Sequence, residues 1–498
     1  MVFLLGIDCG STVIKAVLYD ATGVQVAASA ARLNHRSPQP RWVERDTDAL
    51  WQQTARAIAK VVSVVGDASD IASVGVTGHG DGTYLVDPQG HPTRPGILSL
   101  DSRAHRMVER WAADGLFEAA RELTGQAPFE AAPAGLLRWM LEEEPETLAR
   151  SRWALACKDV IKLRLTGQVA ADPSEASSSF CDVRTQEYSD SALELYGLAD
   201  QRDLLAPVVG SFEVMGQVTP EAALRTGLRA GTPVVSGLHD VDACAIGSGA
   251  FGPGQVSVIA GTYSINQTVA TTPAVDERWY TRNFIRPGEW MHMAFSPASA
   301  TNLEWFVREL CPELFSAALA RGEDPFELVT GEVGSSALMQ LPVFLPFLYG
   351  SPLGAGPSGG FLGLRGWHRR SHLVAAVMEG VVLNHRWHVA DLQSKFSLRE
   401  VRLCGGGARS DVWAQLFADG LGLPVARTRE LEAGTLGAAL CAGIGVGTFP
   451  SLENAVASAV TVSDVREPED AHTAMLTERY DVFRSVADAL SPLWSRFE

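Results

Sequence analysis

The chain has 498 residues, 46% of them hydrophobic and 20% charged, and its formal net charge is −17 at neutral pH. This length allows roughly two to four domains with large cores, and the acidic balance argues against a surface that binds nucleic acids or anionic membranes. A polyanionic ligand would need backbone N–H groups and a metal ion nearby to offset the charge of the protein.

The cysteines indicate a reducing compartment. They are seven in number, scattered along the chain, and form no CxxC pair, which favours free thiols. The apolar start of the chain is too short for a signal peptide, and the later apolar stretch 338–348 contains two prolines and is too short to span a bilayer. We therefore expect a cytoplasmic protein with neither a membrane nor a nucleic-acid partner.

The chain begins with a predicted hairpin. An apolar strand over 2–7 is followed by the turn Asp8-Cys-Gly-Ser-Thr12 and a second strand over 13–19. Gly10 lets a ligand approach the backbone, and successive N–H groups with the hydroxyls of Ser11 and Thr12 can form an anion-binding nest. Because Asp8 would repel a phosphate directly, we expect it to hold a metal ion or its waters. An ordinary hairpin is the alternative.

Two polar loops follow further strands in the first half of the chain. A strand over 71–77 ends in Gly78-His79-Gly80-Asp81-Gly82, which is typical of a loop that approaches a small polar ligand. A second polar loop over 97–103 leads into a helix and carries Asp101 and Arg103. A plain turn with solvated side chains is the alternative for the first loop.

Asp240 lies near the middle of the chain, where a strand over 232–236 ends and a helix begins. A carboxylate at this position stands at the mouth of an α/β sheet, where ligands bind. The alternative is that Asp240 only caps the helix. The residues after it are small and apolar, which predicts a helix packed tightly against a neighbour.

A second Gly-Thr turn repeats the first arrangement. Strands over 255–260 and 265–270 enclose Gly261-Thr262-Tyr-Ser264, and two such hairpins predict two similar folds that grip one polyphosphate. Later, a strand over 401–404 leads through Gly405-Gly-Gly-Ala-Arg-Ser410 into a helix, where a flat or anionic group can rest on bare backbone. A tight packing turn is the alternative there.

Other nucleotide and metal motifs are excluded. The GxGxxG spacing at 354–359 contains a proline and opens no helix, and no Gly-Lys dipeptide occurs that could belong to a P-loop. The histidine pairs His368/His372 and His385/His388 lack further ligands, so they are not predicted to bind a metal.

Together these stretches resemble the FGGY carbohydrate kinases of the actin, hexokinase and Hsp70 ATPase superfamily. The first phosphate motif is matched by Gly6 to Lys15, the second by Gly261 to Ser264, and the C-terminal signature begins at Gly405. Asp240 matches the catalytic base of the family. Within the family the chain looks closest to pentulose kinases of the L-xylulose type, on Gly78 to Gly82, Gly237 to Ala243 and Leu345 to Gly350.

The resemblance implies two ribonuclease-H-like α/β domains, over residues 1–243 and 244–498, that flank a cleft. It implies ATP and Mg²⁺ as cofactors, with Asp8 and Asp240 at the metal and Asp240 as the base. The sugar is expected against His79, Gly80, Asp81, Asp101 and Arg103 together with Asp240. ATP is expected at Gly10, Ser11, Thr12, Lys15, Gly261, Thr262, Gly406, Gly407 and Ser410.

Departures from the family pattern bear on the substrate. Glycerol kinases carry Arg-Glu where this chain has Gly80-Asp81, and many members carry Trp in place of Ser99. Both changes are expected to enlarge the pocket, so we predict a ketopentose, L-xylulose first. A polyol such as erythritol or glycerol is the alternative, and a non-catalytic ATP-binding protein of the superfamily is the rival of another class. The sequence leaves the oligomeric state open, a homodimer included.

Overall fold

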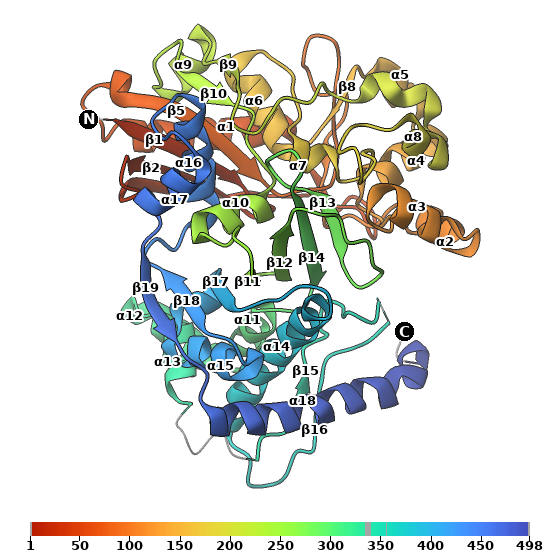
Figure 1. The fold of residues 1–498 in the computed structure, drawn as a ribbon, viewed down its shortest axis with the longest axis vertical. Helices are drawn as coiled ribbons and strands as arrows, with labels where there is room; N and C mark the ends of the chain where they lie inside the picture. Colours follow the sequence, from red (N-terminus) through yellow and green to blue (C-terminus); the bar gives the residue numbers. More distant parts are fainter. Residues whose placement is uncertain (1, 334–339, 355, 497–498) are drawn as a thin grey trace. The chain divides into compact units, whose positions relative to one another are not determined.

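The computed structural model describes residues 2–333, 340–354 and 356–496, which form two compact units (Figure 1). The first unit runs to Gly249 and also contains Val269–His292 and Glu432–Thr461. The second unit contains Ala250–Thr268, Met293–Leu431 and the residues from Val462 onward. The division that the sequence predicts, between residues 243 and 244, falls inside helix α10 (Asp240–Ser248). Residues 338, 339 and 355, which belong to stretches considered above, lie outside the described residues.

The first unit is built on a six-stranded sheet in the order β3-β2-β1-β5-β10-β9. Strand β1 pairs antiparallel with β2 and parallel with β5, so it has a partner at each edge. Nearly all of its residues are buried, which is why it reads as an apolar run. The sheet consists of β1 (Phe3–Cys9), β2 (Val13–Asp20), β3 (Gln25–Arg32), β5 (Ile71–Gly78), β9 (Val214–Gln217) and β10 (Pro233–Val235).

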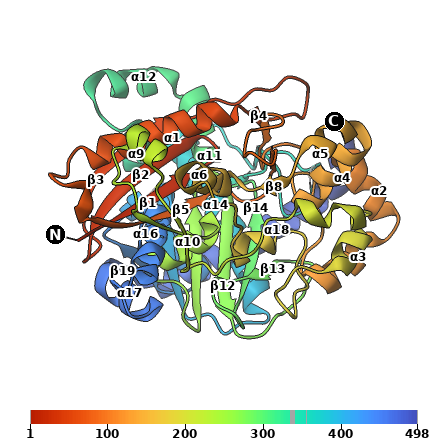
Figure 2. The same ribbon diagram turned by 90° about the horizontal axis from the view of Figure 1, so that it is seen from above.

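Helices cover both faces of this sheet (Figure 2). Helices α1 (Thr47–Val62), α6 (Cys157–Thr166) and α9 (Pro220–Thr226) lie on one face, and α10 and α16 (Ala433–Gly445) lie on the other. The remaining helices of the unit are α2 (His105–Ala113), α3 (Leu116–Thr124), α4 (Pro133–Glu143), α5 (Pro145–Arg150), α7 (Pro173–Ala176), α8 (Asp190–Leu195) and α17 (Leu452–Ala459). Its short strands are β4 (Glu44–Arg45), β6 (Tyr84–Val86), β7 (Gly96–Ile97) and β8 (Trp153–Leu155).

Helix α16 lies unusually close to β1 and to α10. A Cβ atom built on Gly6 would lie 1.9 Å from the carbonyl oxygen of Thr435, and one built on Gly247 would lie 1.9 Å from that of Ala433. The small residues after Asp240 therefore serve the tight helix packing that the sequence predicts, and α16 is the neighbour.

The second sheet repeats the arrangement of the first, with the order β13-β14-β12-β11-β17-β18-β19. Strand β11 pairs antiparallel with β12 and parallel with β17, as β1 does with β2 and β5. The predicted repetition of the hairpin is thus confirmed. The strands are β11 (Gln255–Ala260), β12 (Ser264–Ala270), β13 (Tyr280–Asn283), β14 (Trp290–Ser296), β17 (Glu400–Cys404), β18 (Val425–Thr428) and β19 (Val462–Arg466).

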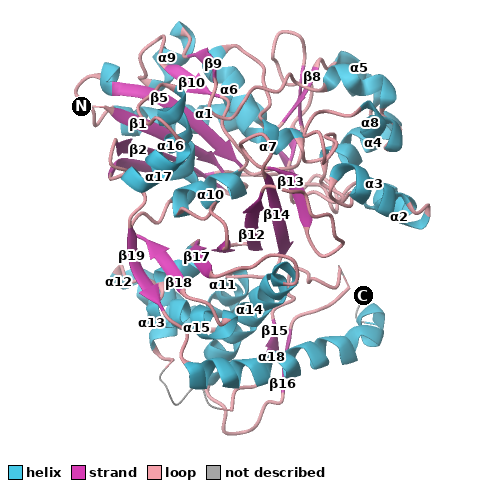
Figure 3. Ribbon diagram, viewed as in Figure 1, coloured by secondary structure: helices cyan, strands magenta, loops and turns pink. Residues whose placement is uncertain are grey.

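Three long helices of the second unit pack side by side: α14 (Arg370–Gln393), α15 (Asp411–Leu421) and α18 (Asp470–Leu490) (Figure 3). The shorter elements are α11 (Thr301–Trp305), α12 (Pro312–Arg321), α13 (Pro325–Gly331), β15 (Val343–Leu345) and β16 (Gly360–Leu362). Over the described ranges, no helix is both long and apolar enough to cross a membrane. All seven cysteines are free thiols.

Candidate active site

The turn after β1 is held from behind by a buried arginine. The guanidinium of Arg45 donates to the carbonyl oxygen of Gly10 at 3.5 Å and to that of Ser11. Because the C=O and N–H of a trans peptide point in opposite directions, the N–H groups of Ser11 and Thr12 face away from Arg45. The turn therefore presents successive N–H donors, as an anion-binding nest does. Sequence reasoning missed Arg45, which lies outside the motif.

The turn between β11 and β12 has the same construction in the second unit. The carbonyl oxygen of Gly261 accepts from the Ala300 N–H at 3.0 Å, and that of Thr262 accepts from the Thr301 hydroxyl at 3.2 Å. The N–H groups of Thr262 and Tyr263 consequently point away from these donors. Both predicted phosphate turns thus have their carbonyls satisfied on one side and their N–H groups turned to the other.

Asp8 carries an unsatisfied carboxylate oxygen at the end of β1. Its Oδ1 is buried and has no hydrogen-bond partner among the described residues. Burial, and then the negative charge of Asp240, raise the pKa of Asp8 to about 7, although the Lys15 cation opposes this. Lys15 itself pairs with Glu432 at 2.5 Å. A buried carboxylate oxygen without a hydrogen-bond partner fits a cation.

The donor set suits Mg²⁺ better than a metal held wholly by protein. In the part of the chain that the structure describes, no three His, Cys, Asp or Glu side chains gather to hold a metal ion. Mg²⁺ usually takes one or two carboxylates and completes its shell with waters and substrate phosphates. Asp8 and Asp240, which interact electrostatically, can supply those carboxylates.

Asp240 is the first residue of α10, and His239 holds the N-cap position before it. The Nδ1 atom of His239 lies 2.9 Å from Asp240 Oδ1, and the Asp240 side chain keeps 34% of its surface exposed. Burial opposes ionisation of Asp240, but the imidazolium of His239 outweighs it and lowers the pKa. Asp240 is therefore an ionised, accessible carboxylate. Because His239 takes the N-cap position, the alternative that Asp240 only caps the helix is wrong.

The loop after β5 packs against His239 in a way that corrects one expectation. A Cβ atom built on Gly80 would lie 1.6 Å from His239 Nε2. The imidazole therefore fills the space left by the missing side chain. The prediction that Gly80 enlarges the substrate pocket is wrong. Asp81 has a φ of +57° and Gly82 a φ of +73°, so the loop turns sharply at these residues.

Asp81 is paired with an arginine that the sequence did not reveal. Arg282 of β13 donates from Nη2 to Asp81 Oδ1 at 3.1 Å and from Nη1 to Oδ2 at 3.4 Å. Its Nε donates to Gln126 Oε1 at 2.8 Å, and its Nη1 lies 3.4 Å from His239 Nε2. Roughly two hundred residues separate Arg282 from Asp81 in the sequence, so no local pattern could have connected them.

The other predicted sugar residues lie in internal networks. The oxygens of Asp101 accept from the Val43 N–H at 2.6 Å and from the Arg103 guanidinium at 2.8 and 2.9 Å. Arg103 also pairs with Glu44 at 2.9 Å, and neither Asp101 nor Arg103 has exposed side-chain surface. This network supports the second polar loop.

His79 is also buried. Its Nδ1 lies 3.4 Å from Ser99 Oγ, and its Nε2 lies 3.5 Å from the Tyr84 hydroxyl. Both ring nitrogens thus face hydroxyl groups of the protein. One of these hydroxyls belongs to Ser99, the residue that stands where many family members carry Trp.

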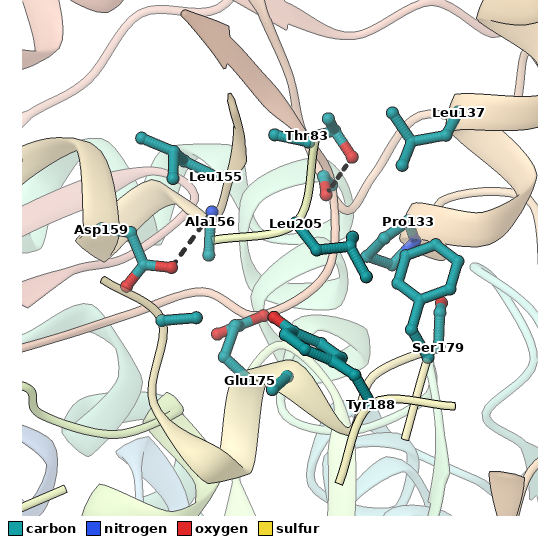
Figure 4. Close-up of a pocket in the computed structure, with 15 residues that line it drawn as sticks. Thr83, Pro133, Leu137, Leu155, Ala156, Asp159, Glu175, Ser179, Tyr188 and Leu205 are labelled. Atoms are coloured by element: carbon teal, nitrogen blue, oxygen red, sulfur yellow. Dashed lines mark hydrogen bonds between the residues drawn. The ribbon is translucent and has the colours of Figure 1, made fainter. Parts of the chain in front are cut away.

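A small cavity of about 50 Å³ lies behind the first polar loop (Figure 4). Its wall includes Glu175, which accepts from the Asp81 N–H at 3.2 Å and from Lys158 at 3.1 Å. Lys158 is fully buried and also pairs with Asp172 at 2.6 Å. Glu175 thus fixes the backbone of Asp81 while Arg282 fixes its side chain, so the loop is braced before any ligand binds.

The second unit has a cavity of about 360 Å³ next to its Gly-Thr turn. Apolar and aromatic side chains form part of its wall, and the 3₁₀ turn after β17 brings Gly406 and Ser410 to it, while Gly407 is buried close to Ala260. Such a wall with bare backbone suits a planar, polar-edged ligand. The lining comprises Gly261, Thr262, Ala300, Thr301, Leu303, Glu304, Asp324, Phe326, Glu327, Thr330, Gly406, Arg409, Ser410 and Trp413.

Family models match both halves of the chain. The N-terminal domain of the FGGY family of carbohydrate kinases matches residues 3–247, and the C-terminal domain matches residues 256–446. The chain belongs to the FGGY family. It is an ATP-dependent carbohydrate kinase, as the resemblance implied, and the rival interpretation as a non-catalytic ATP-binding protein is set aside.

Similar proteins span almost the whole chain. L-xylulose/3-keto-L-gulonate kinase of Escherichia coli (strain K12) is 34% identical over 91% of this chain and 90% of the relative. Erythritol kinase of Brucella abortus (strain 2308) is 30% identical over 99% of this chain and 97% of the relative. The crystal structure of xylulose kinase from Rhodospirillum rubrum matches with a TM-score of 0.84 at 28% identity, over 99% of this chain and 100% of that structure. The predicted fold class, that of the actin and hexokinase superfamily, is confirmed.

Proposed function

We propose that this kinase transfers the γ-phosphate of ATP to a hydroxyl of a ketopentose, L-xylulose first, with Asp240 as the general base. The observation that carries the proposal is the Asp240 carboxylate, which is accessible, ionised and held by His239 at 2.9 Å. The L-xylulose kinase names among the relatives support this choice of sugar.

In the proposed reaction Asp240 accepts the proton of the attacking hydroxyl. A general base must be ionised and within hydrogen-bond reach of that proton, and the bond to His239 limits the rotation of the carboxylate. Phosphoryl transfer depends mainly on positioning and on neutralising charge. The braced loop that carries Asp81 supplies positioning for the sugar.

The nucleotide is assigned to the turns and the second-unit cavity. We place the adenosine in the 360 Å³ cavity, at Gly406 and Ser410, and phosphate groups at the N–H donors of the Gly261-Thr262 turn. The turn over 10–12 and Lys15 are also proposed to contact phosphate. Mg²⁺ is the proposed metal, with Asp8 and Asp240 as its carboxylates, and when bound it neutralises charge on the phosphates.

A polyol such as erythritol is a second candidate substrate. The erythritol kinase relative matches this chain over nearly its full length, and a polyol presents the same row of hydroxyl groups without the ketone. Glycerol is the shortest member of this class.

The test is a sugar-dependent ADP-release assay with purified protein, ATP and Mg²⁺. The panel contains L-xylulose, D-xylulose, erythritol, glycerol and 3-keto-L-gulonate, the last because it stands in the name of the E. coli relative. We expect the highest kcat/KM with L-xylulose, lower values with D-xylulose and erythritol, and poor use of glycerol. Release that no sugar or polyol stimulates contradicts the proposal, and glycerol equal to L-xylulose contradicts the choice of a ketopentose.

A further inference from the structure

Every nitrogen of the Arg282 guanidinium is engaged within the first unit. Nη1 and Nη2 hold the Asp81 carboxylate at 3.4 and 3.1 Å, and Nε holds the Gln126 side chain at 2.8 Å. The Arg282 and Asp81 side chains are only 5% and 14% exposed. A two-pronged pair between an arginine and a carboxylate is strong and fixed in direction, so Asp81 and Arg282 form one neutral unit.

This pair lies next to the proposed general base. Arg282 Nη1 is 3.4 Å from His239 Nε2, and His239 Nδ1 is 2.9 Å from Asp240 Oδ1. One imidazole ring therefore separates the guanidinium from the catalytic carboxylate. Two contacts through His239 thus connect the pair with the carboxylate at which the reacting hydroxyl of the sugar is proposed to bind.

Two further carboxylates near the loop also have cationic partners. Glu175 pairs with the buried Lys158, and Asp240 pairs with His239. Arg282 is the residue type best suited to recognise a substrate carboxylate, but Asp81 occupies its two-pronged face. A substrate that carried a carboxylate would have to displace Asp81 and leave a nearly buried negative charge without its partner, which is strongly unfavourable.

We propose that Arg282 is a specificity-determining residue, and that its pair with Asp81 restricts the sugar site to uncharged polyhydroxylated substrates and excludes sugar acids. The inference rests on the proposed function and deepens it. The pair occupies the position that a substrate carboxylate would need. It therefore discriminates by weakening the binding of sugar acids. The remaining lone pairs of Asp81 stay available to accept bonds from sugar hydroxyls.

The test compares L-xylulose, which is uncharged, with 3-keto-L-gulonate, which carries a carboxylate. In the wild type we expect kcat/KM for L-xylulose to exceed that for 3-keto-L-gulonate by about 100-fold or more. Asp81→Asn removes the internal negative charge and frees the two-pronged face of Arg282. We expect this variant to gain at least about 10-fold in kcat/KM for 3-keto-L-gulonate, mainly through KM, while L-xylulose use falls.

The double variant Asp81→Asn/Arg282→Gln separates a specific effect from general loosening. It removes the cation as well, so the gain with the sugar acid should disappear. Asp276→Asn is the matched control, because Asp276 forms a two-pronged pair with Arg278, at 2.7 and 2.8 Å, in the same chain segment but more exposed. This control should leave the ratio of the two kcat/KM values unchanged.

If Asp81→Asn does not fold, Arg282→Lys provides the test. A lysine keeps the charge but cannot hold Asp81 through two parallel bonds, so the preference for L-xylulose should fall. The inference is overturned if the wild type uses both substrates equally, or if a folded Asp81→Asn or Arg282→Lys variant keeps the wild-type ratio. A wild type that phosphorylates neither these two sugars nor any polyol would overturn the proposed function instead.

Discussion

The imidazole of His239 occupies the space that a side chain on Gly80 would need, since a Cβ atom on Gly80 would lie 1.6 Å from His239 Nε2. A glycine at position 80 is therefore required by His239, the residue that holds the proposed base. His239 joins Asp240 on one side and faces Arg282 on the other. The loop and the start of α10 thus depend on each other.

Gly80→Ala should therefore impair catalysis through His239. The added methyl group displaces the imidazole and releases the Asp240 carboxylate from its fixed orientation. We expect kcat to fall by about 10²-fold and the free energy of unfolding to fall by ~1–3 kcal/mol, as for other overpacked sites. Steady-state kinetics and urea denaturation measure the two effects.

Gly66→Ala is the matched control for this prediction. A Cβ atom there meets nothing within 4 Å, so both kcat and stability should stay close to the wild type. An active and stable Gly80→Ala variant would show that His239 can move without consequence.

Asp240→Asn should abolish sugar phosphorylation while the protein still folds and binds ATP. The amide keeps the shape of the side chain but cannot accept the proton, and loss of a general base commonly costs ~10²–10⁴-fold in rate. Sugar-dependent ADP release measures the rate, and a thermal melt with and without ATP measures folding and binding. Asp470→Asn is the control, because Asp470 is likewise the first residue of a helix, α18, but is exposed. Turnover like that of the wild type would remove Asp240 from the mechanism.

Arg45→Gln should weaken the use of ATP more than the use of sugar. Without the guanidinium, the carbonyls of Gly10 and Ser11 lose the donor that orients the turn. Hydrogen bonds from charged groups stabilise a structure more than those between neutral groups. We therefore expect KM for ATP to rise by about 10-fold or more. Arg56→Gln, on an exposed position of α1, should leave KM unchanged. An unaltered KM for ATP in Arg45→Gln would mean that the turn keeps its shape without this residue.

The sequence predicted the parts of the site whose residues are close together in the chain. Asp8 with its turn, the repeated Gly-Thr turn and Asp240 at a strand-to-helix junction depend on local spacing, and the structure has these elements. One boundary differs, because β1 extends through Cys9 and therefore includes Asp8, which the sequence places in the turn. What the sequence did not show depends on contacts between distant segments. Arg282 reaches Asp81, and α16 returns to pack on β1. The space beside Gly80 was misjudged for the same reason, because no local pattern reveals that His239 fills it.

The last prediction concerns the unsatisfied carboxylate of Asp8 and how it responds to pH. Burial and the charge of Asp240 raise its pKa to about 7 from a usual value of 3.8. Between these two values the folded protein binds more protons than the unfolded chain, so this group lowers the stability as the pH rises toward 7. Asp8→Asn removes the ionisable group. In the absence of Mg²⁺ the Tm of the variant should therefore exceed that of the wild type, by an amount that grows from pH 5 to pH 7.5.

Mg²⁺ should reverse this difference if Asp8 binds it. A cation stabilises the ionised carboxylate, so added Mg²⁺ should raise the Tm of the wild type more at pH 7.5 than at pH 5, and should have little effect on Asp8→Asn. Asp488→Asn, on an exposed position of α18, should behave as the wild type does at each pH. Equal responses of the wild type and Asp8→Asn to pH and to Mg²⁺ would contradict the metal role, since a purely structural aspartate would gain nothing from the ion.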